Sequence, residues 1–245
     1  MKRFQSLFLA FFALLLTFGF YSAFSLFEKE KPHVAPIKAI AQTGPVKEGL
    51  KTLYLEELLG LSVDKPKAIH PKEAEKILQQ SPLIKSVSVS HLNPETLYID
   101  YTVRTPLFII GDVENLALDK EGVTFPLNPF FTPKNLPLLY LGDSYQESKT
   151  HLALSLLDLL KEEVGFIDLS KSDDPSLGKR EIVVSIDSDL LRLSTKHYAK
   201  EIEHYRKLRK HFDGPLIIDL RIPNLAYVHS SKFLHKSDAN GNMRR

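Results

Sequence analysis

The amino-acid sequence predicts an α+β protein with an amino-terminal transmembrane helix, a small β-α-α-β-β domain and a larger, β-rich α+β domain. Three observations predict this architecture: an uncharged apolar run over residues 4–27, helical and then alternating apolar patterns over residues 36–106, and short apolar runs separated by prolines over residues 107–229. The chain has 245 residues, of which 43% are hydrophobic and 25% charged, so it can fill the cores of two such domains.

The apolar run at the amino terminus is long enough to cross a bilayer. It contains no charged residue, and a helix of this length spans about 36 Å, against about 30 Å of hydrocarbon. Because Lys2 and Arg3 precede the run, the positive-inside rule places residues 1–3 in the cytoplasm and the following domains outside it. The residues expected to anchor this helix in lipid are Leu7, Phe11, Leu15 and Phe18.

A cleaved signal peptide is the competing interpretation of this run. Ala23-Phe24-Ser25 offers small residues at the two positions that a signal peptidase reads. The apolar stretch exceeds the usual hydrophobic region of a signal peptide, about 7–15 residues, and this favours an uncleaved anchor. Both interpretations export the rest of the chain. Residues 28–35, which are polar and contain a proline, then form a linker from the membrane surface.

Composition and motifs argue against several classes of function. Cysteine is absent, which excludes disulfides, thiolate metal sites and a cysteine nucleophile. Lys2 and Arg3 account for the net charge of +2, so no domain-wide positive charge predicts nucleic-acid binding. No nucleophile elbow, phosphate-binding glycine loop or zinc-protease motif occurs, and we expect no catalytic residue, metal or cofactor. His197, His204 and His211 are seven residues apart, about 10.5 Å along a helix, too far to share one metal ion.

Residues 36–106 predict a strand, two helices and a hairpin, with the helices covering one face of the sheet. Glycine and proline mark the ends of these elements: Gly44-Pro45 ends the first strand, Gly60 ends the first helix, and Pro71 begins the second. The turn Asn93-Pro94-Glu95 joins two strands of alternating pattern. The predicted ranges are 37–42 for the strand, 50–61 and 71–80 for the helices, and 84–92 and 97–103 for the hairpin.

Residues 107–229 predict a second, β-rich domain. Residues 107–149 read as short strands and turns because they are rich in proline. Asp173-Asp174 and the pair Asp187 and Asp189 lie in sequences that read as loops. The remaining predicted elements are a helix over 152–164 ending at Gly165, a strand over 182–186, a helix over 195–212, and two strands within 215–228 that join near Pro223-Asn224. Residues 230–245 are polar and are expected to form a disordered tail.

Short motifs in the hairpin and after it resemble those of one family. In chain order they are Pro82-Leu83-Ile84, Pro94-Glu95-Thr96-Leu97-Tyr98-Ile99, Arg104-Thr105-Pro106, Leu118-Asp119-Lys120-Glu121-Gly122-Val123, Leu136-Pro137 and Ile218-Asp219-Leu220-Arg221. Their order and spacing behind a single membrane anchor are similar to those of the FtsQ/DivIB family of bacterial cell division proteins. The resemblance covers most of residues 1–229 and identifies residues 36–106 as a POTRA-like domain and residues 107–229 as a β domain.

This resemblance implies a non-enzymatic scaffold of the divisome, held in the inner (cytoplasmic) membrane at the division site. The POTRA domain of the family serves recruitment, and its β domain binds FtsB/FtsL-type (DivIC-type) division proteins; other divisome membrane proteins are further expected partners. An anchored periplasmic chaperone of the POTRA type and an anchored cell-wall hydrolase are the alternatives.

The family also implies a binding site, because its last strands pair with a strand of the partner. The corresponding residues here are Arg221, Ile222, Leu225, Ala226, Tyr227 and Val228. An edge strand offers unpaired amides and carbonyls for such pairing, and Pro223 limits it to the residues that follow. Leu225, Tyr227 and Val228 can instead complete the domain's own sheet, and Arg221 can pair with Asp219 rather than with an acidic partner residue.

Overall fold

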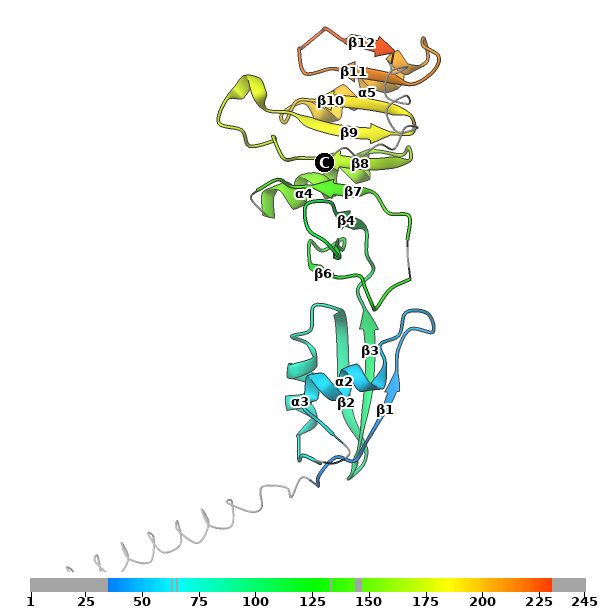
Figure 1. Ribbon diagram of the computed structural model, residues 1–245, viewed down its shortest axis with the longest axis vertical. Coiled ribbons are helices and arrows are strands. Elements are labelled where there is room, and N and C mark those ends of the chain that lie inside the picture. The colour runs from blue at the N-terminus through cyan, green and yellow to red at the C-terminus, as the bar shows by residue number, and fades with distance from the viewer. Residues whose placement is uncertain (1–34, 63, 65, 133, 144–146, 231–245) are drawn as a thin grey trace, which may run out of the picture.

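The computed structural model describes residues 35–62, 64, 66–132, 134–143 and 147–230. They form an α+β protein with two sheets, one of three strands and one large mixed sheet of nine strands. In Figure 1 the small sheet lies at one end of an elongated molecule, and the strands of the large sheet follow one another toward the other end.

The N-terminal unit has the predicted order of strand, two helices and hairpin. Its strands are β1 (Ala39–Thr43), β2 (Ile84–Asn93) and β3 (Thr96–Val103), and its helices are α2 (Thr52–Leu59) and α3 (Pro71–Leu78). Strand β3 is central, parallel to β1 and antiparallel to β2. Gly60 caps α2 with φ 62°, a left-handed conformation that glycine adopts without strain. Pro71 occupies the first turn of α3, where its missing N–H costs no helical hydrogen bond.

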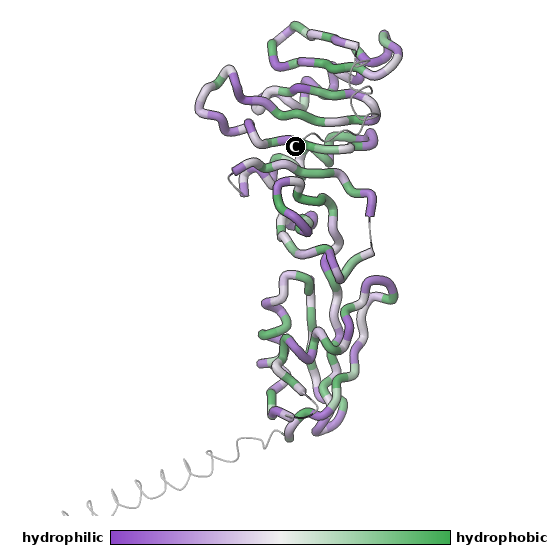
Figure 2. The backbone as a smooth tube through the Cα atoms, in the orientation of Figure 1, coloured by the Kyte–Doolittle hydropathy of each residue, from purple (hydrophilic) through white to green (hydrophobic). Residues whose placement is uncertain are grey.

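The large sheet has the strand order β12-β11-β10-β9-β8-β7-β4-β5-β6. Its strands are β4 (Phe108–Ile110), β5 (Leu116–Leu118), β6 (Thr124–Pro126), β7 (Leu138–Tyr140), β8 (Val164–Asp168), β9 (Ile182–Ile186), β10 (Asp189–Leu193), β11 (Leu216–Asp219) and β12 (Tyr227–Ser230). A short 3-10 helix, η1 (Leu177–Lys179), precedes β9. Hydrophobic segments recur along these strands, whereas many of the connecting loops are hydrophilic (Figure 2).

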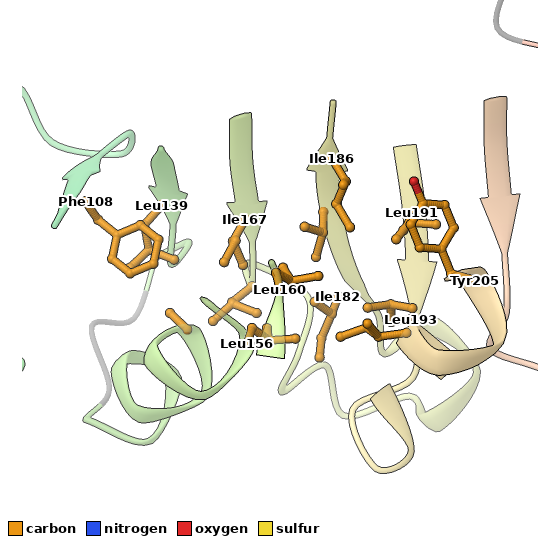
Figure 3. Close-up of a cluster of buried hydrophobic side chains, with 14 of the residues drawn as sticks. Phe108, Leu139, Leu156, Leu160, Ile167, Ile182, Ile186, Leu191, Leu193 and Tyr205 are labelled. Atoms are coloured by element: carbon orange, nitrogen blue, oxygen red, sulfur yellow. The ribbon is translucent and has the colours of Figure 1, made fainter. Parts of the chain in front are cut away.

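Two helices cover one face of the large sheet. Helix α4 (Glu147–Leu159) and helix α5 (Tyr198–Arg209) lie on the same side of the strands, and the core side chains fill the space between them (Figure 3). Leu156 of α4 and Tyr205 of α5 are buried against strand residues such as Ile167 and Leu191. Alternate strand residues point to this core, as expected for a sheet with one covered face.

Several predicted helix boundaries are wrong. The helix expected from residue 152 begins at Glu147, inside the segment expected to hold only strands and turns, and the helix expected over 195–212 spans Tyr198–Arg209. The helix expected to continue to Gly165 ends at Leu159, and residues Val164–Asp168 form strand β8 instead. Strand β8 pairs with β7 on one side and β9 on the other, so pairing on both edges decides its conformation. The loop interpretation of Asp189 is also wrong, because Asp189 is the buried first residue of β10. The tail expected from residue 230 begins at least one residue later, since Ser230 closes β12.

The N-terminal unit and the first strands of the large sheet share a core. Ala117 of β5, Phe125 of β6 and Phe131 belong to the same buried cluster as Leu97 and Ile99 of β3. The aromatic rings of Tyr54 and Phe130 also meet, with centroids 4.9 Å apart. The sequence boundary predicted after residue 106 is therefore crossed by a continuous set of apolar contacts.

Several expectations concern residues outside the described ranges. These are the cytoplasmic segment 1–3, the anchor 4–27 with Leu7, Phe11, Leu15 and Phe18, the small residues Ala23-Phe24-Ser25, the linker as far as residue 34, and the tail from residue 231. Among the residues that are described, no helix combines the length and the hydropathy that crossing a membrane requires.

Candidate partner-binding edge

The six residues expected to bind a partner lie together at the outer end of the large sheet. Tyr227 and Val228 begin β12, the edge strand next to β11. Arg221, Ile222, Leu225 and Ala226 lie in the segment that leads from β11 into β12. Asn224 turns this segment with φ 60°, and the N–H of Leu225 donates to the carbonyl of Ile222 at 3.1 Å.

The register of β11 shows which backbone groups of β12 face outward. The N–H of Leu220 donates to the carbonyl of Arg192 at 3.0 Å, and this hydrogen bond continues the pairing of β11 with β10. The backbone groups of Leu220 therefore face β10. Successive residues of a strand direct their backbone groups to opposite sides, so Ile217 and Asp219 face β12. Their antiparallel partners are His229 and Tyr227. The N–H and C=O groups of Val228, which lies between these two, therefore point away from the sheet.

The side chains of this edge divide between the core and the solvent. Val228 and Ala226 pack against the core cluster of the large sheet. Tyr227, Ile222 and Leu225 are 60%, 51% and 47% exposed. Tyr227 and Val228 also complete the domain's own sheet by pairing with β11, as one interpretation expected, whereas Leu225 lies before the strand. The exposed side chains of Tyr227, Ile222 and Leu225 are free to contact another molecule.

Arg221 is engaged within the sheet. Its Nη2 atom lies 2.7 Å from Oδ2 of Asp219, and its Nη1 atom lies 3.2 Å from Oε2 of Glu181. The hydrogen bond to Asp219 raises the pKa of Arg221 above its ordinary value. Burial raises the pKa of Asp219, but hydrogen bonds from Arg221 outweigh it and hold that pKa below its ordinary value. Of the two roles expected for Arg221, the structure therefore shows the ion pair with Asp219.

A groove adjoins the edge on the side of helix α5. It has a volume of about 430 Å³ and lies between α5 and residues 220–226. Leu208 and Leu220 supply apolar lining, and the exposed Ile222 and Leu225 lie on the side opposite α5. The contribution of α5 to this groove was not predicted from the sequence, although the basic character of residues 196–210 was a usable signal.

The lysine and histidine side chains of the groove come from α5 and its N-terminal cap. His197 at its N-terminal end, with Lys200 and His204 inside it, lines the groove. Glu201 is the single lining carboxylate, and it is only 7% exposed. Its two oxygens accept hydrogen bonds from the N–H of Ser194 at 2.7 Å and the hydroxyl of Ser194 at 2.6 Å, so its charge is directed away from the opening.

Asp189 fixes the position of this end of the sheet. Its carboxylate accepts hydrogen bonds from the N–H of Leu216 and from the hydroxyl of Tyr205, both at 2.9 Å. It also pairs with Nε of Arg209 at 2.7 Å. One buried carboxylate therefore ties the start of β11 and two turns of α5 to β10. Burial, and then the hydrogen bond to Asp189, raises the pKa of Tyr205 well above its ordinary value, which keeps the phenol a donor.

Metal binding has no support in the described part of the chain. No group of three or more histidine and carboxylate side chains there has the geometry of a metal site. His197 and His204 share the groove, but the third histidine of the repeat, His211, does not line it.

No protein-family model matches the sequence, and no curated protein matches it.

Proposed function

We propose that this protein is a bitopic scaffold of the bacterial division machinery that holds a partner strand on β12. The observation that carries the proposal is the outer edge of β12, which pairs with no other strand among the described residues. The backbone groups of Val228 are directed outward there, beside the exposed side chains of Tyr227, Ile222 and Leu225. The expected partners are FtsB/FtsL-type (DivIC-type) coiled-coil proteins of the same membrane.

The chemistry of the edge supports strand addition. Proteins usually protect exposed edge strands with lysine, proline, bulges or a covering helix. Residues 227–230 contain neither lysine nor proline, and Pro223 lies in the preceding loop. An added strand gains affinity from backbone hydrogen bonds and specificity from its alternate side chains. At this edge the backbone of Val228 can supply the hydrogen bonds, and the exposed side chain of Tyr227 can contact a side chain of the added strand.

The order of elements supports the same proposal. A β-α-α-β-β unit precedes a large mixed sheet, in the order that the resemblance to the FtsQ/DivIB family implies. Helices on one face of the sheet, and a last strand whose outer side pairs with no described strand, suit a protein that binds others by its edge. Recruitment through the N-terminal unit and anchoring by residues 4–27 in the inner membrane, with the two folded units outside the cytoplasm, are parts of this proposal.

The experiment compares three forms of the full chain as bait in a detergent extract of the source cell's membranes. Val228→Pro removes the outward N–H while keeping an apolar side chain, because the N–H of residue 228 does not serve the pairing with β11. Val228→Ala is the matched control, since it removes more side chain but keeps the N–H. We expect the unmodified chain and Val228→Ala to recover a small coiled-coil membrane protein, identified by mass spectrometry, and Val228→Pro to lose it.

Equal recovery by Val228→Pro would contradict the proposed site on β12. Failure of the unmodified chain to recover any coiled-coil protein would contradict the scaffold function itself. Circular dichroism must show the same folded spectrum for all three forms, because a variant that unfolds says nothing about the edge.

A further inference from the structure

We propose that residues 231–236 turn back from the end of β12 and lie across the face of the large sheet opposite to α4 and α5, where Phe233 and Leu234 cover apolar side chains of the strands. The occupant of this face is therefore a segment of the chain itself, and the inference does not depend on the proposed function. The composition of residues 230–245 predicts a disordered tail, and the proposal takes residues 231–236 out of that prediction.

A row of apolar side chains crosses the face opposite to the helices. Successive residues of a strand point to opposite faces of a sheet, so the neighbours of the buried core residues point away from α4 and α5. Residues paired across adjacent strands share a face. The pairing from β4 to β11 therefore places one serine and five apolar side chains, all half-buried, in a single row: Ile109, Leu138, Phe166, Ser185, Leu190 and Ile217. None of the apolar five belongs to either core cluster of the protein.

The next row on the same face is polar, which limits what can cover the apolar one. From β8 to β11 it consists of Asp168, Val183, Arg192 and Asp219. Nη1 of Arg192 lies 3.3 Å from Oδ2 of Asp219. A second copy of the sheet packed flat on this face would take these charges out of water, and the desolvation of such groups is costly. An apolar strip one residue wide instead fits a single extended segment.

The tail begins beside this row. Strand β12 is antiparallel to β11, and its last residue, Ser230, lies beside the start of β11. Adjacent strands are about 4.8 Å apart, and an extended segment advances about 3.3 Å per residue. Phe233 and Leu234, which follow closely after Ser230, are therefore within reach of Ile217 on the neighbouring strand and of Leu190 on the strand after it. Covering these side chains removes apolar surface from water.

The charge at this end of the sheet complements the charge of the tail. The starts of β8, β10 and β11 lie at the same end as the last residue of β12. Glu163, Asp187 and Asp213 lie just before these three strands, are exposed, and form no ion pair with any residue that the structure describes. In the tail, Lys232 and Lys236 stand on either side of the apolar pair. Lysines that flank the contact therefore meet carboxylates at the strand ends.

The arginines of α5 at this end do not neutralise these carboxylates. Nε of Arg206 pairs with Glu162 at 2.7 Å, and Nε of Arg209 pairs with Asp189, also at 2.7 Å. Both guanidinium groups are therefore engaged with other acidic residues, and the exposed carboxylates stay available to the lysines of the tail.

The first test measures proximity by disulfide formation in the full chain in detergent micelles. The chain has no cysteine, so an introduced pair is unique. Leu190→Cys/Leu234→Cys and Ile217→Cys/Phe233→Cys join the tail to the apolar row. Lys207→Cys/Leu234→Cys is the control, because Lys207 is exposed on α5 at the other face. A disulfide forms only where the two Cα atoms approach within about 7 Å.

We expect at least one pair on the apolar row to close about tenfold faster than the control, because docking raises the effective concentration of the two thiols. Equal rates for the control and both row pairs would overturn the proposal. Circular dichroism of the reduced variants must match that of the unmodified chain.

A charge series tests the part of the lysines in the faster row pair. Lys232→Glu/Lys236→Glu should slow its closure about threefold, as expected for losing and reversing exposed ion pairs. Arg244→Glu/Arg245→Glu makes the same change of charge further along the same tail and should have little effect. Equal slowing by both variants would overturn the pairing of the tail with the strand-end carboxylates.

A third measurement leaves the strands of the sheet unchanged. The chain has no tryptophan, so Phe233→Trp provides a single fluorescent probe, and Met243→Trp provides its control in the same tail. We expect Phe233→Trp to emit at a shorter wavelength than Met243→Trp and to be quenched less by acrylamide, because the docked ring is partly removed from water. Identical emission and quenching of the two probes would overturn the proposal.

Discussion

The two ends of the large sheet are built from similar short strands but finish in opposite ways. At the β6 end, Ala117 and Phe125 are buried in the core that the sheet shares with the N-terminal unit. At the β12 end, Tyr227 is mostly exposed and no described strand pairs with the outer side. Because the strands are short at both ends, strand length does not explain why one edge is covered and the other is exposed. The exposed edge lies where none of the strands that the structure describes pairs with the outer side of β12.

Ion pairs also differ between the two ends of the large sheet. At the closed end, Nη1 of Arg104, which follows β3, pairs with Asp119 at 2.7 Å and Glu121 at 2.8 Å, both of which follow β5. Lys85 of β2 also pairs with Glu121, at 2.6 Å. These ion pairs join the two units. At the open end, Arg221 pairs only with residues of its own sheet. On β12 and the segment before it, backbone groups and apolar side chains are what remains for a partner.

The largest expected effect comes from breaking the closed end. Phe125→Ala removes a ring that is fully buried between the two units, and we expect a loss of about 4 kcal/mol in the free energy of unfolding. Equilibrium urea denaturation of the full chain measures it. Phe130→Ala, at a half-buried ring beside Tyr54, should cost less, about 1–2 kcal/mol. A loss below about 1 kcal/mol for Phe125→Ala would mean that the shared core does not hold the units together.

A smaller loss is expected when the buried carboxylate of the open end is changed. Asp189→Asn keeps the shape of the side chain but removes the charge facing Arg209 and leaves either Leu216 or Tyr205 opposite an amide N–H₂ group. We expect a loss of about 2 kcal/mol in the free energy of unfolding. The control is Asp187→Asn, at an exposed turn position with φ 48° that asparagine also tolerates. Equal stability of the two variants would argue against Asp189 as the anchor of β11 and α5.

The smallest expected effect is a pH dependence near α5. Hydrogen bonds from Arg206 lower the pKa of Glu162 from 4.5 to about 2. Because the pKa is lower in the folded protein, the stabilisation is fully present above about pH 4.5 and is lost as the pH falls toward 2. Since both side chains are partly exposed to solvent, it amounts to about 1 kcal/mol.

The measurement for this pair is the difference in unfolding free energy between pH 6 and pH 3. It should be about 1 kcal/mol smaller in Glu162→Gln than in the unmodified chain. Other carboxylates with lowered pKa values, such as Asp219 and Glu121, contribute equally to both forms and cancel. An identical pH dependence in the two forms would show that the pair does not help to hold α5 on the sheet.

Local patterns in the sequence were sufficient for most of the N-terminal unit. The left-handed cap at Gly60, the proline in the first turn of α3 and the alternation on both sides of Asn93-Pro94-Glu95 each act over a few residues. The same holds for the last two strands, whose connection at Pro223-Asn224 was predicted and is confirmed. Such features depend on backbone geometry and burial that neighbouring residues determine.

Other features depend on residues far apart in the chain, and only the tertiary structure decided them. Val164–Asp168 became a strand because β7 and β9 pair with it, and Asp189 became a buried anchor because Leu216 and Tyr205 donate to it. The groove likewise needs α5 and residues 220–226 to lie side by side. By itself the sequence determined which segments fold and which residues can line an edge. The tertiary structure decided which edge stays open, because unpaired backbone groups and unpaired charges are defined only once every other partner in the chain has been placed.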